Sequence, residues 1–181
     1  MKKKYIIPKT TNAEEIKRIR GQFHMTQKEF AAFLGVSVPT VERWEASGEH
    51  ITGPVVFLLE ILRRNPQIEE EFTLPDRRYP IRLKYCLGNM ICTVIDVDDV
   101  GRRISIRNYT DNLLYRAFGR NEKPTYADYE EFLESRCFPR SRDKMKLMLK
   151  EYDLPFYDPF LIVEKTEGRL EEDDFHIEIE R

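Results

Sequence analysis

The chain has few of the residues that build disulfide frameworks, zinc clusters or membrane spans. It contains three cysteines and three histidines among 181 residues, and the cysteines lack the paired Cys-x-x-Cys spacing of zinc sites. No stretch approaches the ~20 apolar residues that cross a bilayer, and the basic start leads into no apolar run of a signal peptide. We therefore expect a cytoplasmic protein with no metal, no cofactor and no membrane association, whose thiols are reduced and mostly buried: Cys86, Cys92 and Cys137.

Residues 25–45, MTQKEFAAFLGVSVPTVERWE, are the most informative segment. Thr26 and Glu29 have the spacing of a capping box, which predicts a helix start. Apolar residues at helical spacing then give this first helix one buried face. Gly35 is placed to end it in the left-handed conformation. The segment predicts two short helices joined by a tight turn.

The second of these helices, over residues 37–46, is predicted to present one face outward. Ser37 is placed to cap it, and Pro39 fits its first turn, where amides lack intrahelical partners. Val41 and Trp44 are spaced to bury it against its neighbour, which leaves Arg43 on the exposed side. The alternative is a generic amphipathic helix pair, because such hairpins are common.

Residues 10–66 resemble the lambda-repressor/Cro-like (XRE) helix-turn-helix family, and VSVPTVERWE is especially similar to antitoxins of the HigA and MqsA type. The resemblance implies that the second motif helix enters the major groove. Many relatives carry an amide where Val38 stands, so base reading here would depend on hydrogen bonds from Arg43 to guanine and on apolar contact with thymine methyl groups. The residues expected at DNA are Gln27, Lys28, Ser37, Val38, Pro39, Thr40 and Arg43.

Charge and apolar surface agree with a DNA-binding head over residues 1–66. This part carries eleven basic and seven acidic residues, whereas the whole chain has a net charge of −2. An excess of positive charge favours phosphate contacts, although ordinary surface charge would give the same count. Residues 54–64, PVVFLLEILRR, have more apolar surface than a small core needs. Because such domains bind two-fold sites, we expect a homodimer on double-stranded DNA.

A linker is predicted over residues 67–79, and residues 80–181 change character. Alternating apolar residues and turn signals predict an antiparallel meander of three strands over 81–87, 90–97 and 103–107. Helices are expected over 126–135, over 141–152 with Ser141 as cap, and after Asp158-Pro159, with a closing strand over 175–180. The fold class is therefore α+β, with an all-α head and a small α+β partner or dimerisation domain.

The second half resembles accessory proteins encoded beside HipA-like toxin kinases, through an SRxxPRxR stretch and YDPxxIxxKTxGR. This resemblance implies that residues 80–181 contact a toxin or such a kinase. The candidate partner-binding residues are Arg136, Arg140 and Arg142, a basic cluster suited to phosphate or an acidic surface. The alternative is that these arginines pair with local glutamates, namely Glu130, Glu131 and Glu134.

An enzymatic role has weaker support. Asp96, Asp98 and Asp99 lie close enough in sequence to ligate Mg²⁺ as in a nuclease, with Asp173 and Asp174 as further carboxylates. The alternative is that Asp98-Asp99 serves a turn. The sequence has no glycine-rich phosphate loop and no nucleophile–base pair, so we expect no catalytic residues. The favoured function is a transcriptional regulator, an autorepressor or antitoxin, with a protein-interaction module as the alternative.

Overall fold

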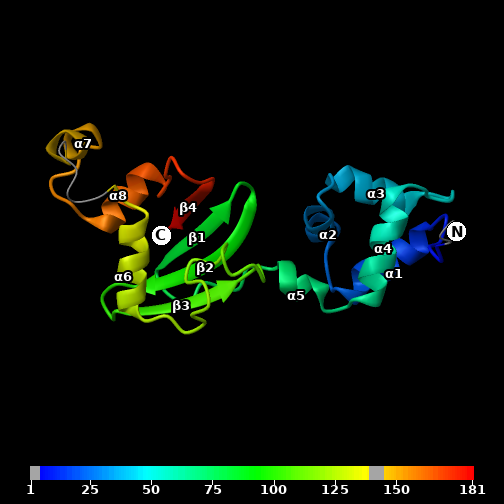
Figure 1. Ribbon diagram of the computed structural model, residues 1–181. Coiled ribbons are helices and arrows are strands. Elements are labelled where there is room, and N and C mark those ends of the chain that lie inside the picture. Colours follow the sequence, from blue (N-terminus) through cyan, green and yellow to red (C-terminus); the bar gives the residue numbers. More distant parts are fainter. Residues whose placement is uncertain (1–4, 139–144) are drawn as a thin grey trace, which may run out of the picture. The chain divides into compact units, whose positions relative to one another are not determined.

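The computed structural model describes residues 5–138 and 145–181, which form two compact units, residues 1–73 and 74–181 (Figure 1). The first unit is all helical. Its helices are α1 (Ala13–Gln22), α2 (Gln27–Leu34), α3 (Val38–Ala46), α4 (Pro54–Arg64) and α5 (Ile68–Phe72). The first residues of the predicted linker over 67–79 thus form α5. Ile68 of this helix packs against the core of the first unit.

The helical core forms from residues at helical spacing on each of the four longer helices. Ile16 and Ile19 of α1, Phe30 of α2 and Val41 of α3 are at most 1% exposed. The apolar run on α4 buries Val55, Val56, Leu59 and Leu62 but leaves Phe57 half exposed. The surplus apolar surface predicted for α4 is therefore present, centred on Phe57.

The second unit is a four-stranded antiparallel sheet with helices, so the predicted α+β fold is confirmed. The strands are β1 (Ile81–Leu87), β2 (Met90–Asp98), β3 (Arg103–Asn108) and β4 (Phe175–Glu180), in the order β3-β2-β1-β4. The three-stranded meander is thus extended by the closing strand, which pairs with β1.

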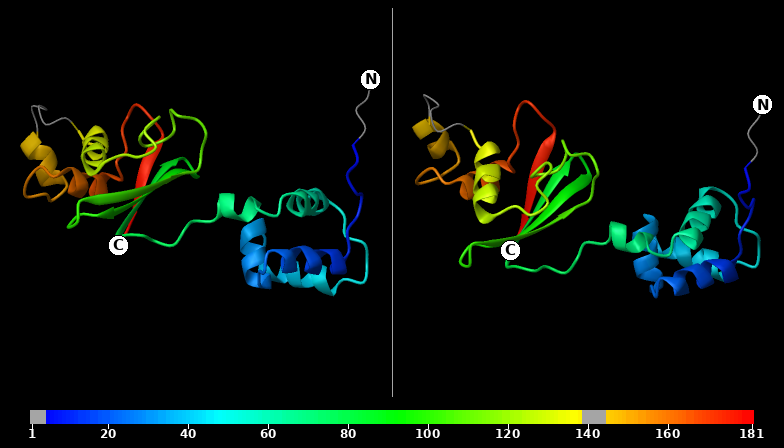
Figure 2. Two further views of the ribbon diagram at one scale, coloured as in Figure 1. Left: turned by 90° about the horizontal axis from the view of Figure 1, so that it is seen from below. Right: turned by 60° about the horizontal axis from the view of Figure 1, so that its bottom comes forward.

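Helices α6 (Tyr126–Ser135) and α8 (Pro159–Thr166) pack on each other and against the sheet, and lie side by side in Figure 2. Apolar residues that alternate along the strands face them, including Leu83, Ile95 and Ile177. The remaining helix, α7 (Met145–Glu151), lies within the predicted helix over 141–152, and the predicted cap Ser141 lies outside the described residues.

The opposite face of the sheet carries charged side chains. Arg82 on β1 lies beside Asp96 on β2, with Arg82 Nε donating to Asp96 Oδ1 at 2.6 Å, and both residues are about 95% buried. The segment leading into β1 covers this pair, because the Arg78 amide donates to Asp96 and Arg82 donates to the Pro75 carbonyl. The central strand β2 is therefore buried on both faces.

Candidate nucleic-acid interface

Local hydrogen bonds fix the turn between α2 and α3 as the sequence predicts. The Glu29 amide donates to Thr26 Oγ1 at 3.2 Å, and the Thr26 amide donates to Glu29 Oε2 at 2.7 Å, so the capping box is complete. Gly35 ends α2 with φ of 66°, a conformation that costs glycine little. The next amide, of Val36, donates back to the Ala31 carbonyl at 2.9 Å. The capping box and Gly35 thus form the predicted helix-turn-helix.

The start of α3 differs in one detail from the expected cap. Ser37 occupies the N-cap position, but its hydroxyl lies 2.9 Å from Thr40 Oγ1 and accepts from no backbone amide. The physical reason is the composition of the first turn. Pro39 has no N–H to donate, and the Thr40 amide already donates to the Ser37 carbonyl at 2.9 Å. The two hydroxyls therefore bond to each other at the outer start of the helix.

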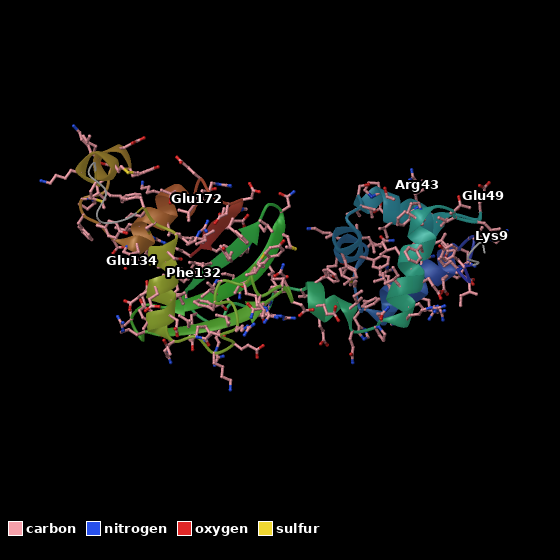
Figure 3. All side chains as sticks on the ribbon, in the orientation of Figure 1. Lys9, Arg43, Glu49, Phe132, Glu134 and Glu172 are labelled. Carbon is pink, nitrogen blue, oxygen red and sulfur yellow. The ribbon has the colours of Figure 1, made fainter. Side chains whose placement is uncertain are left out.

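The structure divides the predicted DNA-contact residues into exposed and half-buried groups. Arg43 is exposed on α3 and pairs with no residue that the structure describes (Figure 3). Lys28, Ser37 and Pro39 are also exposed, whereas Val38 and Thr40 are half-buried. Val38 packs against the helical core, so only part of its side chain is available for contact with a base.

Gln27 lies in a buried polar network instead of being fully free. Its side-chain amide donates to Glu45 Oε2 at 2.8 Å. Glu45 also accepts two bonds from Arg20, at 2.7 and 3.0 Å, and Arg20 donates further to the Met25 carbonyl at 2.9 Å. One of the two N–H groups of the Gln27 side-chain amide is committed to Glu45, and the other N–H and the side-chain carbonyl stay available for a further contact. Gln27 therefore links α2 to α3.

This network fixes α3 to the other two helices. Glu45 is 5% exposed, and Arg20, Gln27 and Glu45 come from α1, α2 and α3 respectively. The hydrogen bonds from Arg20 lower the pKa of Glu45 despite the burial that opposes the shift. A carboxylate kept ionised in this way keeps its bonds to both neighbours and fixes the orientation of α3.

Sequence reasoning missed this network, although its signal is present. Arg20 falls on the apolar face of α1, one residue after Ile19 and four after Ile16. Glu45 likewise follows Val41 by four residues on the buried side of α3. Two opposite charges placed at core positions of adjacent helices indicate a buried pair, because neither is tolerated there alone.

Other basic residues of the first unit are paired with neighbouring glutamates. Arg18 bonds to Glu15 at 2.7 Å, and Arg63 and Arg64 both bond to Glu60. These pairs lie on α1 and α4, away from the motif helices α2 and α3 in sequence. Positive charge on the motif itself is therefore carried by Lys28 and Arg43.

Arg136 has an interior position, which differs from a surface partner-binding role. It is 6% exposed and donates to Asp173 at 2.6 and 2.9 Å, to the Gly168 carbonyl at 2.9 Å and to the Phe175 carbonyl at 3.2 Å. Its ion-pair partner is thus Asp173 and none of the nearby glutamates. The other two members of the predicted cluster, Arg140 and Arg142, lie outside the described residues.

The carboxylates of the nuclease hypothesis are not brought together. Asp96 is paired with Arg82. Asp98 accepts from the Gly101 amide at 2.9 Å and pairs with Arg103, as the turn interpretation predicts. Asp99 accepts from the Tyr126 hydroxyl at 3.0 Å. Asp96, Asp98 and Asp99 thus each have their own protein partner.

Comparison with known proteins supports the identity of the first unit. Residues 16–62 match the helix-turn-helix family HTH_3. A segment of 54 residues, 30% of this chain, is 39% identical to Antitoxin HigA-2 of Vibrio cholerae serotype O1, and covers 52% of that relative. The chain thus spans about half the length of the relative it matches. No solved structure matches.

In the part of the chain that the structure describes, no helix has the length and apolar character needed to span a membrane.

The caps, the left-handed Gly35 and the match over 16–62 agree with one another. Residues 16–62 are a helix-turn-helix domain of the XRE type.

Proposed function

We propose that this protein is a sequence-specific DNA-binding regulator of the antitoxin type, which reads the major groove with the helix over residues 37–46. One observation carries the proposal. Arg43 is exposed and unpaired among the described residues, on a helix held from behind by the buried Glu45. An arginine presented on a rigid helix is suited to donate two hydrogen bonds to guanine.

The other exposed residues of the motif complete the proposed interface. Pro39 and the exposed part of Val38 supply apolar contact, which suits a thymine methyl group. Lys28, at the start of α2, supplies a phosphate contact that positions the domain without reading sequence. In this scheme Gln27 positions α3 through its bond to Glu45, and its second amide N–H can donate to a phosphate or a base edge.

A homodimer is part of this proposal, with α4 at its interface. Phe57 is 51% exposed in the middle of a helix whose other apolar residues are mostly buried. Large exposed aromatic side chains are typical anchors of protein interfaces. We expect Phe57→Asp to shift the protein from dimer to monomer in sedimentation velocity and to weaken operator binding. A variant that stays dimeric would move the interface away from α4.

Residues 80–181 are proposed to contact a protein partner. The similarity of a 54-residue segment to Antitoxin HigA-2 supports a toxin partner for the chain, since an antitoxin acts on a toxin. A toxin is therefore the proposed partner class, with a HipA-like kinase as the alternative that the second-half resemblance suggests. Co-expression of the full chain with the product of each neighbouring gene, followed by size-exclusion chromatography, tests both. Elution of the chain free of every such product would overturn the partner proposal.

The decisive experiment measures binding to the DNA upstream of the protein's own gene, by fluorescence anisotropy at several salt concentrations. We expect Arg43→Ala to lose about 1–3 kcal/mol, roughly 5- to 150-fold, on that DNA and to relax discrimination at one base pair. Lys28→Ala should weaken binding about equally on all sequences and reduce the salt slope by about 1.

Arg18→Ala is the matched control, because Arg18 is an exposed arginine that pairs with Glu15 on α1, outside the motif helices and α4. Its DNA affinity should stay close to that of the unmodified protein. Equal affinity and equal sequence preference for Arg43→Ala and the unmodified protein would refute the assignment of Arg43, and with it the proposed reading helix.

A further inference from the structure

On the charged face of the sheet, a cysteine from the first strand of the second unit lies beside a histidine and a glutamate from its last strand. Cys86 on β1 lies directly opposite His176 on β4, and Glu178 is two residues further along β4 on the same face. One ligand atom from each of the three residues lies within 4.8 Å of the other two. A thiol, an imidazole and a carboxylate thus converge where β1 and β4 pair.

These three groups have weak bonding to the rest of the described protein. His176 Nδ1 is buried and has no hydrogen-bond partner among the described residues. His176 Nε2 is 3.9 Å from Glu178 Oε1, too far for a hydrogen bond. The Cys86 thiol is 3% exposed and makes only a long contact of 3.6 Å with the Lys84 carbonyl. A buried ring nitrogen without a partner needs an explanation, and a bound ion is one.

We propose that Cys86, His176 and Glu178 bind a zinc ion. Thiolate, imidazole and carboxylate are the three side chains that coordinate zinc in proteins. With Zn–S of about 2.3 Å and Zn–N or Zn–O of about 2.0–2.2 Å, tetrahedral ligand atoms lie roughly 3.4–3.6 Å apart. The present separations, up to 4.8 Å, need only small side-chain rotations to reach this geometry.

Charge balance favours a divalent ion at this position. The thiolate and the carboxylate together neutralise Zn²⁺, and the imidazole binds in its neutral form. Lys84 on β1 is ion-paired with Glu180, and its Nζ lies 3.8 Å from Glu178 Oε2.

The fourth coordination position faces a cavity. A space of about 510 Å³ borders the three ligands and is also lined by Gly88, Asn89, Ile91 and Arg169. Zinc held by three protein ligands, with a fourth position open to water or another ligand, is typical of reactive or exchangeable sites rather than of closed structural ones. Arg169 also lines this space, so we expect a water, hydroxide or anion as the fourth ligand.

Zinc at this point would stabilise the second unit, because it joins strands that lie far apart in the chain. A ligand that binds only the folded state raises its stability with concentration. We therefore expect saturating zinc to raise the melting temperature of the second unit by about 5 °C or more. This inference does not rest on the proposed DNA-binding function.

The test uses the full-length, untagged chain and titrates Co²⁺ as a spectroscopic substitute for zinc. We expect one equivalent to bind, with the thiolate-to-cobalt charge-transfer band and the strong d–d bands of a tetrahedral complex, and zinc to displace it. Cys86→Ser should abolish the charge-transfer band. Glu178→Gln, a change at a half-exposed side chain, should keep that band and weaken affinity about 10- to 100-fold.

Matched controls are Cys137→Ser and His50→Gln, which change a thiol and an imidazole outside the cluster. Both should bind cobalt like the unmodified protein. Absence of a charge-transfer band in the unmodified protein, or its persistence in Cys86→Ser, would overturn the proposal. If Cys86→Ser does not fold, an unchanged affinity in both Glu178→Gln and His176→Gln would overturn it equally.

Discussion

The helical unit and the sheet unit build their polar sites from residues at different distances along the chain. In the helical unit, Arg20 and Gln27 reach Glu45 across 25 and 18 residues. In the sheet unit, Lys84 pairs with Glu180 across 96 residues, and Arg136 with Asp173 across 37. Local helix signals therefore carry most of the information for the first unit, whereas strand pairing decides the sites of the second.

The chain carries a natural probe for each unit. Its single tryptophan, Trp44, packs against the core of the helical unit. Its three cysteines are all buried in the sheet unit. Tryptophan fluorescence therefore reports unfolding of the first unit, and thiol accessibility reports unfolding of the second.

The largest effect is expected from Arg136→Ala. The change removes the buried donor of the Gly168 and Phe175 carbonyls and leaves Asp173 with only the Phe175 amide as a donor. Breaking a buried ion pair from one side costs about 3–5 kcal/mol. In urea, the thiol signal should shift by that amount while the Trp44 signal stays in place.

Arg169→Ala is the control, since Arg169 forms an exposed pair with Glu167 that should contribute at most about 1 kcal/mol. Equal shifts for Arg136→Ala and Arg169→Ala would show that the interior network does not hold the sheet unit together. A shift of the Trp44 signal in Arg136→Ala would show instead that the two units unfold as one.

Acid should destabilise the helical unit through Glu45. Its folded pKa lies below the ordinary value of 4.5, so its contribution is present above that value and is lost as the pH falls through the folded pKa. Hydrogen bonds to a charged group contribute about 1.5–3 kcal/mol. We expect Glu45→Gln to lower stability at pH 7 by about 2 kcal/mol and by much less at pH 3, measured by Trp44 fluorescence in urea.

Other carboxylates of this unit also have lowered pKa values, including Glu15, Glu29 and Glu60. The difference in unfolding free energy between Glu45→Gln and the unmodified protein isolates the contribution of Glu45 at each pH. A difference that stays constant from pH 7 to pH 3 would contradict the electrostatic role of Glu45 and leave only its packing.

The smallest effects come from two capping boxes of the same design, one in each unit. Thr26 with Glu29 starts α2, and Thr125 with Asp128 starts α6, with both reciprocal bonds present in each box. Thr26→Ala and Thr125→Ala should each cost about 1 kcal/mol. Thr26→Ala should shift only the Trp44 signal, and Thr125→Ala only the thiol signal. Crossed or shared shifts would contradict the division into two units.

For the helical unit, the sequence was sufficient wherever the determining interactions lie within one helical turn. The capping box of Thr26, the left-handed Gly35 and the apolar spacing predicted α2, the turn and α3, and the structure has them. Ser37 occupies the predicted N-cap position, but its hydroxyl bonds to Thr40 Oγ1 and not to a backbone amide. This choice of partner depends on Pro39 and Thr40 together.

The sheet unit was predictable in its elements and not in its sites. Alternation of apolar residues and turn residues predicted the strands, because the period of two is a local property. The pairing of β1 with β4 is not local, and it alone brings Cys86 to His176. The spacing patterns of metal ligands in a sequence therefore do not point to Cys86 and His176, since these two residues are far apart along the chain.

The sequence by itself determined the helix-turn-helix, the α+β class and the exposed position of Arg43, because helix caps, glycine turns and hydrophobic periodicity act over a few residues. Only the tertiary structure decided that Gln27 bonds to Glu45 and that Arg136 is interior. Long polar side chains reach whichever partner the packing brings near, and that partner is set by the arrangement of whole helices and strands.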